Sequence, residues 1–163
     1  MEHKGTVHLE SERLILRPFV LEDANAMFRN WASDDEVTKF LLWPAHKEPS
    51  ETETVLSRWV EKYSEPTYYC WAIVLKSISE PVGSISVGGN IDERIKAAEI
   101  GYCIGRAWWH TGVTSEALKT VADFLFDQVG VNKIVARHDP RNPNSGGVMK
   151  KMRDEAGRHF KTM

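Results

Sequence analysis

A loop that leads directly into a helix is the first place in this sequence where chemistry is expected. It runs Trp109-His110-Thr111-Gly112-Val113-Thr114-Ser115-Glu116-Ala117, with one glycine and several small hydroxyl residues. The first amides of a helix have no acceptor within the helix, and the helix dipole adds positive charge at the same end. The pattern therefore favours an anion site. An ordinary N-cap by Thr114 or Ser115 is the alternative, and it would explain the hydroxyls but not the neighbouring glycine.

The spacing of apolar residues predicts the elements that must position this loop. Alternating or β-branched runs predict strands at residues 12–19, 68–75, 82–87, 97–104 and 131–138. Apolar residues three and four apart predict helices at residues 21–31, 34–42, 50–63, 114–129 and 145–152. The helix at 114–129 has the clearest stripe and is closed by Gly130. This order of elements predicts an α+β, or mixed α/β, sheet protein with a single domain over residues 1–163.

Composition and charge exclude several classes of protein. The chain has 21 Lys and Arg against 23 Asp and Glu, for a formal net charge of −2, which argues against nucleic-acid binding. Its longest apolar run, residues 68–75, is far shorter than the ~20 residues that span a membrane. The polar start shows no signal peptide, so we expect a cytoplasmic protein. Histidine and cysteine spacing favours no metal site, and we expect Cys70 and Cys103 to be buried free thiols.

Several motifs follow one another along the chain. They are Glu12-Arg13-Leu14-Ile15-Leu16-Arg17-Pro18 with Glu22-Asp23-Ala24, then Glu99-Ile100-Gly101-Tyr102-Cys103-Ile104, then Trp109-x-x-Gly112-x-Thr114-Ser115-Glu116-Ala117-Leu118, and finally Asn142-x-x-Ser145. In this order, over roughly residues 9–152, they resemble the GNAT superfamily of acyl-CoA-dependent N-acetyltransferases. Within that superfamily they are most similar to the RimJ/RimL-type ribosomal-protein acetyltransferases. Each motif alone is weak, but their combination is specific.

The resemblance implies a mostly antiparallel, twisted sheet flanked by helices, with a bulged strand that splays from its neighbour to admit acetyl-CoA. It implies that the pyrophosphate meets the backbone amides of His110, Thr111, Gly112, Val113, Thr114 and Ser115. Trp109 stands where the family has Gln or Arg, and Thr114 where it has Gly or Ala. Both changes are tolerable because amides do the binding. Pantetheine would pair with backbone near Cys103 and Ile104, where an N–H could stabilise an oxyanion.

The implied reaction is attack of a neutral amine on a thioester, which needs a group to remove a proton. Glu99 is the best candidate base, acting directly or through a water molecule. An exposed acid at a strand end is an equally good interpretation of this residue. His138 beside Asp139 is a weaker candidate, and His110 is more simply a spacer in the loop.

The departing thiolate also needs a proton, and here the chain differs from many superfamily members. They carry a tyrosine acid at the position of Met149, which cannot donate a proton. Ser145 is the remaining candidate to assist the thiolate, with Asn142 holding the amides of the coenzyme. A helix cap would also explain both residues. Candidates for the acceptor pocket are Trp31, Phe40, Trp43 and Tyr69, with core packing as the alternative.

The last residues, 150–163, depart from the family. The RimJ/RimL group continues after its last helix with two more strands, which close one wall of the acceptor site. Here the tail is charged and has no period-two apolar alternation, so it predicts no strand and a C-terminally shortened domain. We therefore expect the strand at residues 131–137 to have an uncovered edge. Such an edge favours a homodimer through that strand, or aggregation.

Together these patterns predict a cytoplasmic, metal-independent, acetyl-CoA-dependent N-acetyltransferase. Its acceptor is an amine, and a protein N-terminal α-amino group is one candidate. Two alternatives stay open: a small amine such as a polyamine, an amino acid or an antibiotic as acceptor, or a catalytically impaired acyl-CoA-binding protein. The loop cannot separate the two classes of acceptor, because it is expected to bind the donor. Met149 and the shortened C-terminus favour the impaired protein.

Overall fold

A seven-stranded sheet forms the centre of the molecule in the computed structural model, which describes residues 1–39, 43–88, 91–136 and 160–162. The strands are β1 Leu9–Glu10, β2 Leu14–Arg17, β3 Cys70–Leu75, β4 Glu80–Val87, β5 Ala97–Ile104, β6 Lys133–Ala136 and β7 Phe160–Thr162. They lie side by side in this order. Neighbours from β1 to β5 are antiparallel, whereas β5 with β6 and β6 with β7 are parallel. The predicted mixed α/β fold, with a mostly antiparallel sheet, is confirmed.

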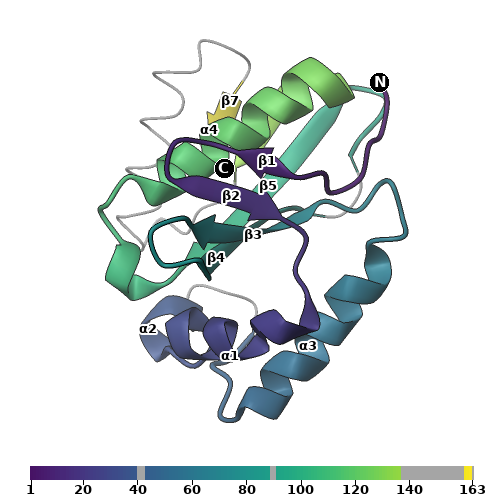
Figure 1. The fold of residues 1–163 in the computed structure, drawn as a ribbon. Helices are drawn as coiled ribbons and strands as arrows, with labels where there is room; N and C mark the ends of the chain where they lie inside the picture. Colours follow the sequence, from purple (N-terminus) through teal and green to yellow (C-terminus); the bar gives the residue numbers. More distant parts are fainter. Residues whose placement is uncertain (40–42, 89–90, 137–159, 163) are drawn as a thin grey trace.

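Helices lie on both sides of this sheet, with α4 on one side and α1 to α3 on the other (Figure 1). The helical segments are η1 Leu21–Asp23, α1 Ala24–Met27, η2 Phe28–Ala32, α2 Asp35–Thr38, α3 Pro49–Lys62, η3 Arg106–Trp108, α4 Val113–Phe124 and η4 Leu125–Val129. The helix predicted at 21–31 is therefore three short segments, of which η2 is a π-helix. The helix predicted at 114–129 is confirmed and ends at Gly130, whose φ is +93°. No described helix is both long and apolar enough to cross a membrane.

Strand β3 explains why the longest apolar run of the sequence belongs to the middle of the sheet. Successive side chains of a strand point to opposite faces. Trp71 and Ile73 therefore join the apolar core under α4, whereas Ala72 and Val74 join the core under α1 to α3. Since both faces of β3 are covered, every residue from Tyr69 to Val74 is buried. The sheet thus separates two cores, and each has its own helices.

The C-terminal tail corrects one expectation. The prediction that residues 150–163 contain no strand is wrong, because β7 pairs in parallel with β6, with Ile134 opposite Phe160 and Ala136 opposite Thr162. Backbone hydrogen bonds make this pairing and do not require alternating apolar side chains. The uncovered edge predicted on β6 is consequently wrong, because β6 lies between β5 and β7. A homodimer stays a prediction, but that edge no longer motivates it.

Candidate active site

Strand β5 changes partners along its length. Its ladder with β4 runs from Ile100 to Ile104, and its ladder with β6 from Ala97 to Ile100. The second half of β5, which contains Cys103, thus extends beyond the described β6, which ends at Ala136. The expected bulge in β5 is wrong, because both ladders keep an unbroken register. A register shift occurs instead between Ile73 and Val74, in the β3–β4 pair.

The turn after β5 is held by close backbone contacts. Gly105 donates its N–H to the Val82 carbonyl at 2.8 Å. A Cβ on Gly105 would lie 2.5 Å from the Asn30 carbonyl oxygen and 2.7 Å from the Trp108 ring, so a larger residue would force the turn away from η2. The indole N–H of Trp109 donates to the Ile104 carbonyl at 3.1 Å. This last bond ties the loop to the end of β5, the strand that the resemblance assigns to pantetheine.

The loop ends at Gly112, which is the N-cap of α4. Its φ of +84° lies in the left-handed region, and its carbonyl accepts the first helical hydrogen bond from the Glu116 amide at 3.0 Å. The alternative that Thr114 or Ser115 caps the helix is wrong, since both lie within its first turn and are buried. No side chain of the described residues caps this helix start. Within the described part of the chain, the first amides of α4 are therefore left for a ligand or water, and an anion such as a diphosphate would fit there.

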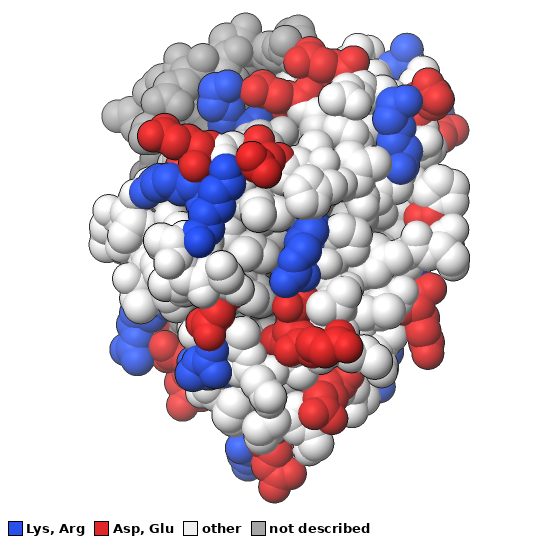
Figure 2. Space-filling model, viewed as in Figure 1, with Lys and Arg blue, Asp and Glu red and all other residues white. Residues whose placement is uncertain are grey.

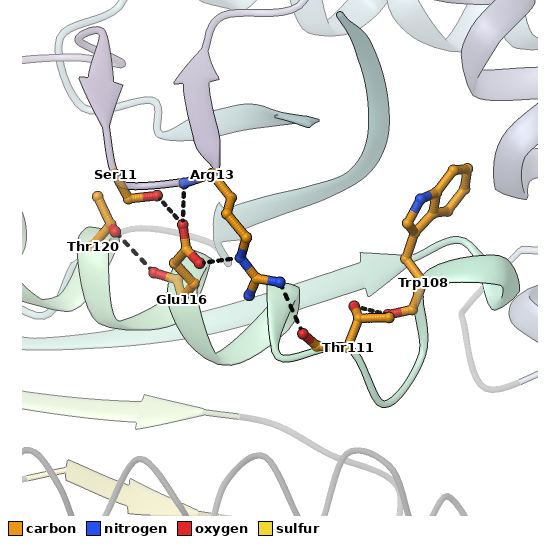
Figure 3. A network of polar contacts seen from close by, with 6 residues as sticks. All are labelled: Ser11, Arg13, Trp108, Thr111, Glu116 and Thr120. Atoms are coloured by element: carbon orange, nitrogen blue, oxygen red, sulfur yellow. Dashed lines mark hydrogen bonds and ion pairs between the residues drawn. The ribbon is translucent and has the colours of Figure 1, made fainter. Parts of the chain in front are cut away.

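An acidic residue in the first turn of α4 is neutralised by the β1–β2 turn (Figure 3). Glu116 accepts hydrogen bonds from Ser11 Oγ at 2.6 Å, from the Arg13 amide at 2.8 Å and from Arg13 Nε at 2.8 Å. Burial by itself would raise the pKa of the Glu116 carboxyl, but the bonds from Ser11 and Arg13 together bring this pKa below its usual value. Glu116 is therefore ionised at neutral pH, and its charge is balanced by Arg13.

Glu99 and Cys103 lie on one face of β5. Cys103 packs with the core under α1 to α3, whereas Ile100 and Ile104 pack with the core under α4. Alternation along the strand puts Glu99 on the same face as Cys103. Glu99 is half-buried and stands opposite Val135 of β6. Cys70 is buried as predicted, but Cys103 is only half-buried. Desolvation still raises the pKa of the Cys103 thiol to about 12, so this thiol is protonated at neutral pH.

The remaining predicted residues divide into two groups. Trp31 and Tyr69 are fully buried, so the core-packing alternative holds for both, whereas Trp43 is half-buried and stacks on His46 with ring centroids 4.8 Å apart. Those that lie outside the described residues are Phe40, His138, Asp139, Asn142, Ser145 and Met149. The described residues contain no group of three or more His, Cys, Asp or Glu that could hold a metal ion.

A shallow cleft that the sequence does not predict lies beside the turn after β5. Its volume is about 350 Å³, and its lining residues are Arg29, Asn30, Asp34, Arg106, Ala107 and Trp108. Arg106 Nε is 3.1 Å from Asp34 Oδ2 across it. Arg29 Nη2 is 2.6 Å from Glu80 Oε1. The cleft joins η2 to η3, so no local sequence pattern signals it.

Elsewhere, on the face in Figure 2, basic and acidic side chains are interspersed and form no single basic patch.

Comparisons with known proteins agree with this arrangement of strand, loop and helix. One relative, an uncharacterized N-acetyltransferase p20 of Bacillus licheniformis, is 33% identical over 137 residues, which is 84% of this chain and 76% of the relative. A GNAT-family acetyltransferase structure from Bacillus anthracis superimposes with a TM-score of 0.76 at 23% identity, covering 90% of this chain and 82% of that chain.

Two further structures have the same fold at lower identity. The ribosomal-protein-S5-alanine acetyltransferase of Vibrio fischeri gives a TM-score of 0.75 at 19% identity, over 90% of this chain and 81% of that chain. The microcin C7 self-immunity acetyltransferase MccE, in complex with acetyl-CoA and AMP, gives 0.74 at 19% identity, over 87% and 78%. The sequence model of the acetyltransferase (GNAT) domain matches residues 13–153. Because that match takes in the sheet from β2 to β6 together with the glycine-capped helix, the chain belongs to the GNAT acetyltransferase family.

Proposed function

We propose that this acetyltransferase uses acetyl-CoA as donor and binds its pyrophosphate at the amides of residues 110–115. The observation that carries the proposal is the start of α4. There a glycine with φ +84° stands in place of a side-chain cap among the described residues. The loop before it follows β5, which extends beyond the described part of its parallel partner β6. The helix dipole and the uncapped amides favour a dianionic diphosphate at this place.

The donor's acyl arm would then lie along the second half of β5. Cys103 and Ile104 lie past the described part of the β5–β6 ladder, and one backbone N–H near them is proposed to stabilise the oxyanion. Asn142 and Ser145 keep their proposed roles, in holding the coenzyme amides and in assisting the thiolate. In each step the protein supplies orientation and hydrogen bonds, while the donor supplies the thioester.

Glu99 is proposed to take the proton from the ammonium form of the acceptor, directly or through one water molecule. Its place on β5 supports this role, because it shares a face with Cys103 on the side of α1 to α3. The cleft beside Arg106 lies past the other end of β5 and is lined by residues of η2 and η3 and by Asp34. The amine is proposed to approach on the face of β5 opposite to α4, which Glu99 shares with Cys103.

The acceptor class is proposed to be a protein N-terminal α-amino group. The RimJ/RimL-like motifs support it, as does the shared fold with an enzyme named for ribosomal protein S5 alanine. A small-molecule amine is the second candidate, favoured by the equal likeness to MccE, a self-immunity acetyltransferase. A third outcome, binding of acetyl-CoA without turnover, would correspond to an impaired enzyme.

The test is release of free coenzyme A from acetyl-CoA, followed with a thiol reagent. The acceptor panel contains N-terminal peptides, the same peptides with a blocked α-amine, polyamines, amino acids and aminoglycosides. Turnover of free peptides, with none of blocked ones, is the expected result. Turnover of small amines alone would move the acceptor to the second class. Coenzyme A binding in calorimetry without turnover of any acceptor would indicate the impaired enzyme, and absence of binding would contradict the donor site.

A further inference from the structure

The turn between β1 and β2 contacts the start of α4, although about 100 residues separate them in the sequence. Ser11 Oγ and the Arg13 amide both donate to Glu116 Oε2, at 2.6 and 2.8 Å, and Arg13 Nε donates to Glu116 Oε1 at 2.8 Å. Both carboxylate oxygens are therefore held by one tight turn (Figure 3). The Glu116 side chain is only 19% exposed, so these bonds are partly shielded from water.

The same guanidinium also reaches the loop. Arg13 Nη1 donates to the Thr111 carbonyl at 3.0 Å, and the Thr111 hydroxyl donates to the Trp108 carbonyl at 2.5 Å. Carbonyl oxygens carry partial negative charge and would repel a phosphate, but these two are engaged on the protein side. In a trans peptide the C=O and the next N–H point in opposite directions. Arg13 therefore aims the Gly112 N–H away from itself.

Arg13 also sets the charge at the helix start. Glu116 lies in the first turn of α4, where an ionised carboxylate would oppose the binding of a dianion. With Arg13 paired to it at 2.8 Å, the two charges cancel locally. Without Arg13, a partly buried, ionised carboxylate would stand beside the amides that bind the diphosphate. The contacts with Glu116 and Thr111 thus act in the same direction.

We propose that Arg13 is the positioning residue of the donor site: it turns the Thr111–Gly112 peptide and neutralises Glu116, so that residues 110–115 can accept the diphosphate of coenzyme A. This inference rests on the proposed donor site. It adds a residue from the N-terminal strand pair, which makes no part of the loop itself. Because the proposed role of Arg13 concerns the diphosphate, replacing Arg13 should weaken the use of a donor that carries a diphosphate and not of one that lacks it.

The test compares two donors, acetyl-CoA and acetyl-pantetheine, which has the same thioester arm but no diphosphate. Arg13→Ala is expected to raise KM for acetyl-CoA by about 10-fold or more, the scale of one lost charge-assisted hydrogen bond, with little change in kcat. The kcat/KM for acetyl-pantetheine should stay near the parent value. Arg94→Ala is the matched control, since it removes one exposed arginine whose side chain, among the described residues, pairs with Asp92.

Equal losses with both donors would overturn the proposal, because they would mean that Arg13 only supports the fold. Unchanged kinetics with both donors would overturn it as well. If Arg13→Ala does not fold, Arg13→Lys carries the comparison: an ammonium keeps the charge but lacks the planar fork that reaches Glu116 and Thr111 together. A rise in KM confined to acetyl-CoA then supports the proposal, and equal changes overturn it. A parent protein that binds no coenzyme A in calorimetry would instead contradict the proposed donor site.

Discussion

Replacing Gly112 with alanine tests the loop most directly, because this residue has two separate reasons to be glycine. Its φ of +84° is a conformation that residues with a Cβ adopt at a cost. A Cβ built at this position would also lie 3.2 Å from Arg13 Nη2, which is a tight contact. Gly112→Ala must therefore either strain the backbone, or shift the loop and its guanidinium partner. Either response changes the site where the diphosphate is proposed to bind.

Gly130, at the other end of the same helical stretch, separates the loss of stability in Gly112→Ala from its effect on the donor. Its φ is +93°, and its Cβ would lie 3.4 Å from the Met1 Cα. A left-handed conformation costs a residue with a Cβ about 1–2 kcal/mol, so both alanine variants should lose roughly that much unfolding free energy. Only Gly112→Ala disturbs Arg13. Loss of the bond from Arg13 to Thr111 should weaken donor binding by about 1.5 kcal/mol, which is about 10-fold in the KM for acetyl-CoA. This value is the low end of the range for hydrogen bonds to charged groups, because the Arg13 side chain is 42% exposed.

The assay pairs chemical unfolding with steady-state kinetics for the parent and both variants. Similar losses of stability, with a raised acetyl-CoA KM only for Gly112→Ala, are expected. A KM that rises equally in Gly130→Ala would show that general loss of stability is responsible. A Gly112→Ala variant with the parent's KM would refute the reasoning, because the loop would then tolerate both the strain and the contact.

Three further outcomes are expected. Glu99→Gln should lower kcat by about 100-fold, the usual effect of losing a general base, and should leave the KM for acetyl-CoA near that of the parent. A pH-rate profile unchanged from the parent would remove Glu99 from the reaction. Tyr63→Phe should lower the unfolding free energy by about 1–3 kcal/mol in urea titrations. The Tyr63 hydroxyl accepts from the Phe19 amide at 2.9 Å and donates to the Cys70 carbonyl at 2.7 Å, and the variant leaves both backbone groups without this partner. A change near zero would mean that water replaces the hydroxyl. The pKa of Glu116 is lowered in the folded state, so its contribution to stability is present above its unfolded pKa of about 4.5 and is lost as pH falls through the folded value. The unfolding free energy should therefore change less between pH 6 and pH 3.5 for Glu116→Gln than for the parent. An equal change in the two proteins would contradict the ionised, paired carboxylate.

Local sequence was sufficient for the elements whose pattern is written in neighbouring residues. The run at 68–75 predicted β3, because a strand covered on both faces is apolar throughout, and the stripe at 114–129 predicted α4 and η4. Periodicity failed for β1 and β7, because strands of two and three residues are too short to show an alternating pattern. It also predicted one continuous helix at 21–31, where the structure has three segments of different winding.

For the candidate site the same division holds. The loop and its glycine could be located from the sequence, because an anion site at a helix start is a local feature. Arg13 was part of a matched motif, but its contact with Glu116 joins residues about 100 positions apart, and no periodicity reports such a pair. The true N-cap could not be chosen either. Gly112, Thr114 and Ser115 are all reasonable caps, and the choice depends on the left-handed turn that Arg13 packs against.

The register of β5 connects the proposed donor side of this protein with the proposed acceptor side. Because strand residues alternate, Ile100 and Ile104 face α4, whereas Glu99 and Cys103 face α1 to α3. A slip by one residue would bury Glu99 under α4 and would turn the proposed base away from the incoming amine. Pairing of Ile104 with Gly83 and the bond from Gly105 to Val82 oppose such a slip at the end of the strand nearest the loop. The same contacts fix where η3 and the loop begin. The backbone of one strand would thereby set the proposed place of the donor's diphosphate and the face from which the acceptor amine attacks the thioester.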